Sequence, residues 1–118
     1  MNSASRDIEM RTFAFAVRVV KLVSAIPRSI AGNTLGRQLV RSGTSVGANV
    51  EEAQGAQSKK DFIRRMNIAR AEARETLYWL RLIKETELLP GNRLGELIQE
   101  ADELVRILTT IVKHARGE

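Results

Sequence analysis

The sequence predicts an all-α protein that folds as an antiparallel, up-down-up-down four-helix bundle. The composition favours helices, because the chain has only two prolines and 4% aromatic residues and is rich in alanine, leucine, arginine and glutamate. Apolar residues recur at helical spacing in four segments of similar length, separated by short turns. Helices joined by short turns must run side by side in opposite directions. The 118 residues suffice for one core, so we expect a single domain over residues 1–118.

The first two helices are expected at residues 8–26 and 34–54. Pro27 ends the first, because the residue before a proline is driven out of the helical region of backbone space. Thr34 is the predicted N-cap of the second helix, after a short linker. Gly55 is the predicted stop signal at its C-terminal end.

The last two helices are expected at residues 59–87 and 92–115. Ser58 is a plausible N-cap for the third helix, since its hydroxyl can accept a hydrogen bond from an amide of the first turn. Residues 89–92, LPGN, form the clearest turn in the sequence. The fourth helix carries a wide apolar stripe on one face, which predicts that this face is buried.

The composition excludes several kinds of chemistry. No cysteine is present, so disulfides, thiol catalysis and cysteine-ligated metal clusters are ruled out. The single histidine, His114, lies near the end of the last helix, where we expect it to be a solvated residue at a helix end that favours cations. We predict no enzymatic activity, no catalytic residue and no cofactor. No apolar run approaches the ~20 residues that span a bilayer, and no targeting signal is visible, so the expected location is the cytoplasm.

Charge is distributed unevenly along the chain. The formal net charge is +5, with nine bases and four acids in residues 1–60 and ten of each in residues 61–118. No acid occurs between Glu9 and Glu51. The bases of that interval are the candidate nucleic-acid-binding residues: Arg11, Arg18, Lys21, Arg28, Arg37 and Arg41. They would contact phosphates without reading sequence. The alternative is a protein with a high isoelectric point and no anionic partner.

The first predicted helix has more apolar surface than one face of a bundle requires. At about 100° per residue, Phe13, Val17 and Val20 fall on one side of it. A second apolar side is built around Val19. Surplus apolar surface usually marks an interface, so we expect self-association with this helix at the seam. The alternative is that the linker, residues 28–33, folds back over the extra face.

The second predicted helix contains residues that are unusual inside a helix. Gly43-x-x-x-Gly47 predicts the close approach of another helix. A phosphate-binding loop, the alternative, would need the pattern GxxxxGK[ST] after a strand, and this pattern is absent. If Asn49 faces the core, its amide needs partners, and Gln38, Ser45 or backbone carbonyls could supply them. We favour a buried structural network over a ligand-binding role for this amide.

Two pairs of glutamates have the spacing of metal ligands on a helix, Glu72-x-x-Glu75 and Glu100-x-x-Glu103. Di-iron bundles combine glutamates with a Glu-x-x-His motif on two helices. No glutamate here is followed by histidine at that spacing. We therefore expect solvated, charged helix faces and no metal site.

The third predicted helix adds further bases but few aromatic side chains. Tyr78 and Trp79 are adjacent on it, and we expect them in the core and an interface rather than as platforms for stacked bases. Nucleic-acid binding would then be directed at the phosphate backbone and depend steeply on salt.

Four segments resemble one known family. The most specific is residues 38–53, QLVRSGTSVGANVEEA, and residues 25–27, 58–62 and 68–80 fit the same pattern. They are similar to the four-helix bundle proteins named after intervening sequences in 23S ribosomal RNA genes. The similarity covers about residues 10–112.

The resemblance has consequences for assembly and partners. It implies a bundle assembled as a ring, usually a homopentamer, with no assigned enzymatic activity. It also implies kinship with the accessory variability proteins of diversity-generating retroelements, basic pentamers that bind nucleic acid and a reverse transcriptase. Four residues match family motif positions that have no assigned role: Gln38, Ser45, Asn49 and Glu52.

We therefore expect a non-enzymatic, ring-like homo-oligomer, a pentamer by resemblance, associated with RNA or DNA through phosphate contacts. RNA is favoured by the name of the family. The alternative is a structural adaptor whose ring docks a partner protein through an exposed groove.

Overall fold

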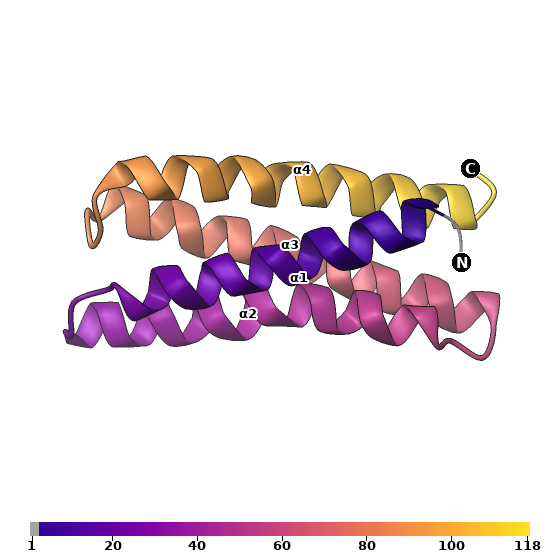
Figure 1. Cartoon of the computed structure of the whole chain (residues 1–118), viewed down its shortest axis with the longest axis horizontal. Coiled ribbons are helices and arrows are strands. Elements are labelled where there is room, and N and C mark those ends of the chain that lie inside the picture. The colour runs from indigo at the N-terminus through magenta and orange to yellow at the C-terminus, as the bar shows by residue number, and fades with distance from the viewer. Residues whose placement is uncertain (1–2) are drawn as a thin grey trace.

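The computed structural model describes residues 3–118 and places them in one antiparallel bundle of four helices (Figure 1). The helices are α1 (Ser3–Ser24), α2 (Ile30–Gln54), α3 (Lys59–Glu85) and α4 (Gly91–Ala115). Each helix packs against the next along the chain, and α1 also contacts α4. Within residues 3–118 no Cα atoms lie within 8 Å of each other across the diagonal pairs, α1 with α3 and α2 with α4. The bundle measures 44 × 21 × 20 Å, and the predicted all-α fold is confirmed.

Helix α2 begins earlier than the sequence predicts. Its first residue is Ile30, and its N-cap is Ser29, so the prediction of Thr34 as the cap is wrong. The Ser29 hydroxyl accepts a 2.8 Å hydrogen bond from the Gly32 amide. Because this bond satisfies a first-turn donor that otherwise lacks a partner, the helix can start one turn sooner.

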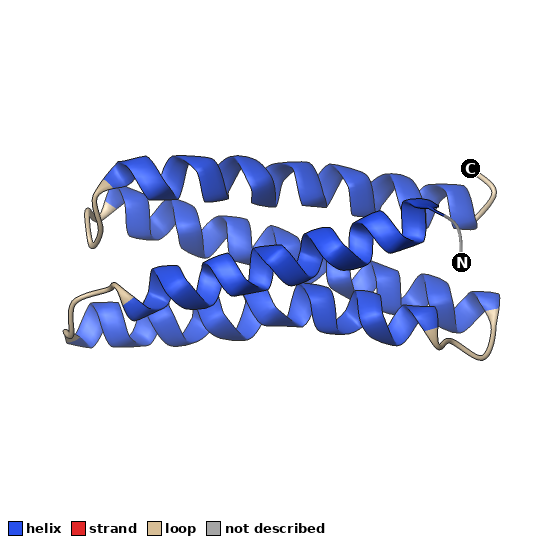
Figure 2. Ribbon diagram, viewed as in Figure 1, coloured by secondary structure: helices blue, strands red, loops and turns tan. Residues whose placement is uncertain are grey.

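Helix α1 also begins earlier than predicted, at Ser3 instead of residue 8, whereas the other helix ends lie within two residues of the predicted ones. The connections between helices are short (Figure 2). The bounds compare as follows: α1 spans Ser3–Ser24 instead of 8–26, α3 spans Lys59–Glu85 instead of 59–87, and α4 spans Gly91–Ala115 instead of 92–115. Ser58 caps α3 as predicted, since its hydroxyl accepts a 3.1 Å hydrogen bond from the Asp61 amide. Gly55 follows the last residue of α2, also as predicted.

The core is one cluster of apolar side chains from all four helices. The apolar stripe predicted on α4 supplies a buried row: Leu94, Leu97, Ala101, Leu104, Leu108 and Val112. From α1, the buried side chains include Phe15, Val19 and Leu22. Each such large side chain stabilises the fold by roughly 1.5–3 kcal/mol. None of the helices within residues 3–118 combines the length and the apolar character that a bilayer crossing requires.

Close packing of α1 on α2 depends on the two glycines of the second-helix motif. A Cβ atom at Gly43 would lie 2.8 Å from Cγ1 of Val19, whose side chain is fully buried. A Cβ atom at Gly47 would lie 3.2 Å from the carbonyl oxygen of Thr12. The predicted close approach of another helix is therefore confirmed, and that helix is α1.

Candidate functional site

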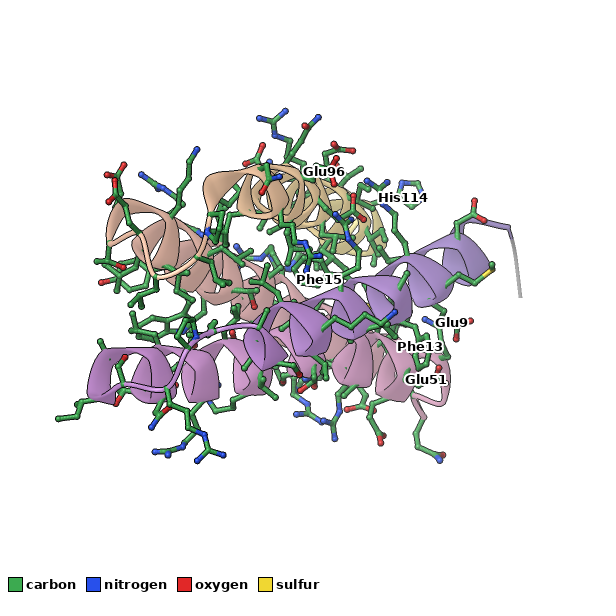
Figure 3. All side chains as sticks on the ribbon, turned by 60° about the vertical axis from the view of Figure 1, so that its left-hand side comes forward. Glu9, Phe13, Phe15, Glu51, Glu96 and His114 are labelled. Atoms are coloured by element: carbon green, nitrogen blue, oxygen red, sulfur yellow. The ribbon has the colours of Figure 1, made fainter. Side chains whose placement is uncertain are left out.

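The outer face of α1 carries a row of exposed apolar side chains, which we call the α1 apolar stripe: Met10, Phe13, Val17 and Val20. Their exposed fractions are 66%, 71%, 38% and 44%. Steps of three and four residues keep them on one side of the helix. Phe15, labelled with Phe13 in Figure 3, is only 1% exposed and belongs to the core. The helix thus has one apolar side for the bundle and a second for solvent or a partner.

The connection from α1 to α2 leaves the α1 apolar stripe exposed. Ile30, where α2 begins, is itself 90% exposed and does not pack over the stripe. The alternative in which residues 28–33 fold back over the surplus face is therefore wrong. Exposed apolar rows of this kind mark interaction surfaces.

Arg11 is held between two glutamates of α4. Its Nε and Nη2 atoms donate to the two carboxylate oxygens of Glu100, both at 2.8 Å, and Nη2 also donates to Glu103 at 2.7 Å. These hydrogen bonds, led by the one to Glu100, raise the pKa of Arg11 above its ordinary value. Because the pKa of Arg11 is higher in the folded protein, its charge stabilises the fold at every pH below its ordinary pKa. This stabilisation is lost only in strongly alkaline solution, as the pH rises through the raised pKa. The Arg11 guanidinium therefore stays charged at every ordinary working pH.

Arg18 and Arg41 also meet carboxylates of other helices. Arg18 lies 3.8 Å from Glu96 of α4, which is labelled in Figure 3. Arg41 of α2 pairs with both Glu72, at 3.5 Å, and Glu75 of α3. Each of the two glutamate pairs with the spacing of metal ligands thus binds an arginine from a neighbouring helix. Glu100 and Glu103 bind Arg11, and Glu72 and Glu75 bind Arg41.

We predict that Arg11→Gln lowers the free energy of unfolding by about 1 kcal/mol, since solvent screens a pair that is partly exposed. The destabilisation arises because two neighbouring carboxylates on α4 remain without their cation. Urea unfolding measures it. Arg106→Gln is the matched control, because its pair with Asp102 is more exposed and lies within one helix, so its effect should stay below about 0.5 kcal/mol. Equal destabilisation in the two variants would contradict this role of Arg11.

The other three candidate bases differ from Arg11, Arg18 and Arg41, because they form no ion pair with the described residues. Lys21, Arg28 and Arg37 are exposed, and no ion pair forms at any of them within residues 3–118. Lys21 lies in the last turn of α1, Arg28 in the connection, and Arg37 in the first half of α2. The structure therefore divides the predicted set into three bases paired within the chain and three bases available to a partner.

The family motif positions form a polar row along one side of α2, and Asn49 is the member that contacts α3. The row is Gln38, Ser45, Asn49 and Glu52. The amide of Asn49 donates to the carbonyl oxygen and the hydroxyl of Ser45, at 2.9 and 3.1 Å. Its Oδ1 atom accepts a 3.4 Å hydrogen bond from Arg65 of α3. The predicted partnership with Ser45 is confirmed, whereas Gln38 instead accepts from Arg41 at 3.1 Å. Glu52 is exposed. Asn49 thus joins a network that links α2 to α3, but the residue is half-buried, so the predicted network is not a buried one.

Sequence reasoning did not decide which of Tyr78 and Trp79 lies on the surface of α3. Tyr78 is 57% exposed, so it lies outside the core of the single chain, and its expected place at an interface stays a prediction. Trp79 is half-buried and packs on the core, as expected. The signal was available, because the buried positions of α3 place residue 78 on the opposite side of the helix. Those positions are Met66, Ala69, Ala73, Thr76, Leu80 and Ile83.

These features define a class of protein: a small four-helix bundle with an exposed apolar stripe on one helix and exposed bases that form no ion pair within residues 3–118. The model of the 23S rRNA-intervening sequence protein family matches residues 6–110, so the chain belongs to this family. The resemblance read from the second-helix motif is thereby confirmed.

A solved structure supports the same fold. It comes from Bacteroides thetaiotaomicron and is described as a protein with unknown function from the S23 ribosomal protein family. The two chains are 36% identical and superpose with a TM-score of 0.86, over 93% of this chain and 98% of that chain. A search of curated proteins found no match.

Proposed function

We propose that the protein is a non-enzymatic, homo-oligomeric basic protein that associates with nucleic acid through phosphate contacts. The observation that carries this proposal is the unpaired state of Lys21, Arg28 and Arg37. They belong to a hairpin, α1 with α2, that has no acid between Glu9 and Glu51. Bases without a carboxylate partner attract phosphates and release the counterions bound there.

Self-association is the second part of the proposal, and the α1 apolar stripe supports it. Burial of the stripe at a subunit contact would remove the largest exposed apolar side chains of α1 from water. We propose a ring of five copies, about 66 kDa from chains of 13.2 kDa, because of the resemblance to pentameric relatives. A ring in the cytoplasm would present five sets of the three bases to one nucleic acid, which raises the overall affinity.

The test is the salt dependence of binding in a variant that lacks all three bases. We predict that Lys21→Gln/Arg28→Gln/Arg37→Gln weakens binding to every sequence alike and lowers the slope of log K against log salt by about 2 to 3 on duplex DNA. The effect is uniform because these side chains contact phosphates, which carry no sequence preference. Fluorescence anisotropy of nuclease-treated protein with labelled structured RNA and duplex DNA measures both effects.

The matched control is Lys59→Gln/Lys60→Gln/Lys113→Gln. These three lysines are exposed and lie at the opposite end of the bundle, so this variant has the same net charge as the test variant. Its salt slope should stay close to that of the unmodified protein. If both variants are weakened to the same extent, overall charge and not this surface accounts for binding. If the unmodified protein binds neither probe even at low salt, the nucleic-acid proposal fails, and a protein partner becomes the object of search.

A further inference from the structure

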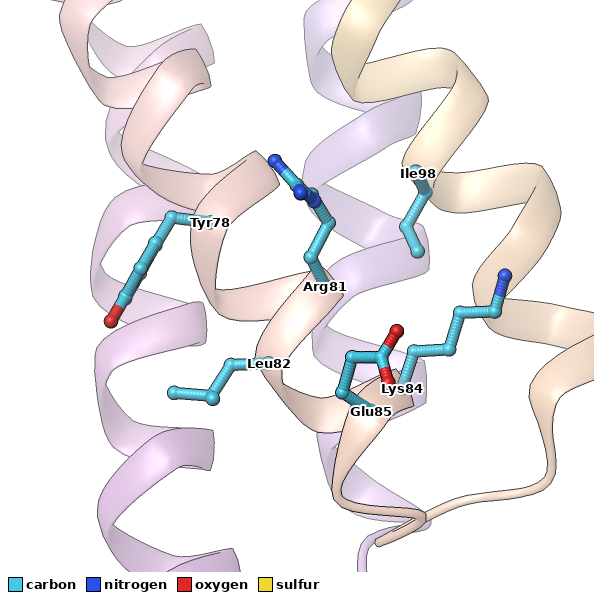
Figure 4. A pocket seen from close by; sticks show the side chains of 6 residues that line it. All are labelled: Tyr78, Arg81, Leu82, Lys84, Glu85 and Ile98. Carbon is cyan, nitrogen blue, oxygen red and sulfur yellow. The ribbon is translucent and has the colours of Figure 1, made fainter.

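A shallow hollow lies on the outer side of α3 and α4, away from the hairpin of α1 and α2. Its volume is about 420 Å³, and its lining residues are Tyr78, Arg81, Leu82, Lys84, Glu85 and Ile98. In Figure 4, Tyr78 and Leu82 stand on one side of the hollow, and Lys84 and Ile98 on the other. The surface therefore combines an aromatic ring, aliphatic side chains and two cations.

Tyr78 is braced by a chain of contacts that starts on α2. Arg41 pairs with Glu75, and Glu75 accepts a 2.8 Å hydrogen bond from the indole nitrogen of Trp79. The rings of Trp79 and Tyr78 lie 5.0 Å apart at 75°, in the edge-to-face arrangement that aromatic pairs favour. Trp79 itself packs against the core. The exposed ring of Tyr78 is thus held by one neighbour whose own position is fixed.

The cations around Tyr78 have no carboxylate partner. Arg74 lies one turn before Tyr78 on the same exposed side, and Arg81 and Lys84 follow it. No ion pair forms at any of the three within residues 3–118. Glu85 contributes one negative charge to the lining, which leaves the surface with a net positive charge. An aromatic platform among unpaired arginines suits an anionic ligand with flat, stackable groups.

Assembly through α1 leaves this surface accessible. α3 lies diagonally across the bundle from α1, and within residues 3–118 no Cα atoms of the two helices lie within 8 Å of each other. The α1 apolar stripe and the hollow therefore face opposite ways. Contact between opposite faces of successive copies builds an open filament and not a closed ring. A ring closed through the stripe must use a different complementary face and keeps the hollow in solvent.

We propose that the hollow binds single-stranded nucleic acid, with one unpaired base stacked on Tyr78 and the adjacent phosphates contacted by Arg74 and Arg81. The inference rests on the proposed association with nucleic acid and adds a preference for single strands. In a duplex the faces of the bases are already stacked on each other, so Tyr78 has no face to contact. In a single strand every base offers one, and stacking tolerates any sequence.

The test compares Tyr78→Ala with the conservative Tyr78→Phe. The ligands are labelled RNA and DNA single strands of about ten nucleotides, within the range of known site sizes, and a duplex of the same sequence. We expect Tyr78→Ala to bind the single strands about tenfold to a hundredfold more weakly, whereas Tyr78→Phe stays within about twofold of the unmodified protein. Duplex affinity should not change. Because Tyr78 is exposed, circular dichroism should show that both variants fold.

The salt dependence separates stacking from charge. Tyr78→Ala should keep the salt slope, since the substitution removes no cation. Arg74→Gln/Arg81→Gln should lower the slope on single strands by about 1.4. If Tyr78→Ala binds single strands as tightly as the unmodified protein, while substitution of Lys21, Arg28 and Arg37 still weakens binding, this inference is overturned and the proposed function stands. If the unmodified protein binds no nucleic acid, both the proposed function and this inference are rejected.

Discussion

A folded monomer of 13.2 kDa is the expected product of Phe13→Asp, where the unmodified protein should assemble into a species of about 66 kDa. The side chain of Phe13 is 71% exposed in the single chain, so an aspartate there leaves the bundle intact. At a subunit contact the same carboxylate would be buried without a partner, which costs several kcal/mol per copy. Size-exclusion chromatography with light scattering measures the mass, and circular dichroism verifies the helical fold.

The matched control for this variant is Ile30→Asp. Ile30 is 90% exposed and lies outside the α1 apolar stripe, so the substitution makes a similar chemical change without touching the proposed seam. It should leave the assembly intact. An assembly that survives Phe13→Asp places the seam on another face of the bundle. If the unmodified protein is a monomer at every concentration, the proposed oligomer is rejected.

The second large effect is expected where α1 crosses α2. Gly43→Ala should lower the free energy of unfolding by about 1–3 kcal/mol, although alanine is the better helix former by about 1 kcal/mol. The added methyl group would lie 2.8 and 2.9 Å from the two Cγ atoms of Val19. Val19 is fully buried and β-branched, so it cannot rotate away without disturbing the core. Urea unfolding measures the destabilisation.

Gly95→Ala is the matched control, and we expect it to raise the free energy of unfolding in the same experiment. Gly95 lies inside α4, and a Cβ atom there would meet nothing within 4 Å. Only the change in helix propensity remains, so this variant should gain roughly 0.5–1 kcal/mol. Val19→Ala should cost less stability in the Gly43→Ala background than in the unmodified protein, because it removes the two atoms that the new methyl group meets. Equal stability of Gly43→Ala and Gly95→Ala would show that a methyl group at residue 43 fits between α1 and α2 without a clash.

Much of the fold could be predicted, because it depends on local patterns. The apolar spacing of α4, the Ser58 cap of α3 and the packing glycines Gly43 and Gly47 were all evident in the sequence and all hold in the structure. The start of α2 could not be predicted, because Ser29 and Thr34 are both good N-cap residues. The choice between them depends on the chain around Pro27, whose carbonyl oxygen lies against buried Gly32.

The candidate site was only partly predictable. The interval without acids identified six bases, but it could not show that Arg11 faces Glu100 and Glu103, since those residues lie 89 and 92 positions away. The helical period of α3 places Tyr78 opposite the buried positions, but the sequence could not show that its neighbour Trp79 is held in place. That arrangement needs the contact between Trp79 and Glu75 and the one between Glu75 and Arg41.

The sequence by itself determined four helices, their antiparallel order, the family and an uneven charge. The helices and their order follow from spacing and turn chemistry, which act over a few residues. The uneven charge follows from the composition, and the family from the resemblance of the second-helix motif. The tertiary structure alone decided which cations remain free and which apolar face stays exposed. Those properties depend on side chains that meet across packed helices, at separations in sequence where no local pattern operates. The free bases, the α1 apolar stripe and the braced Tyr78 are therefore consequences of how the helices pack.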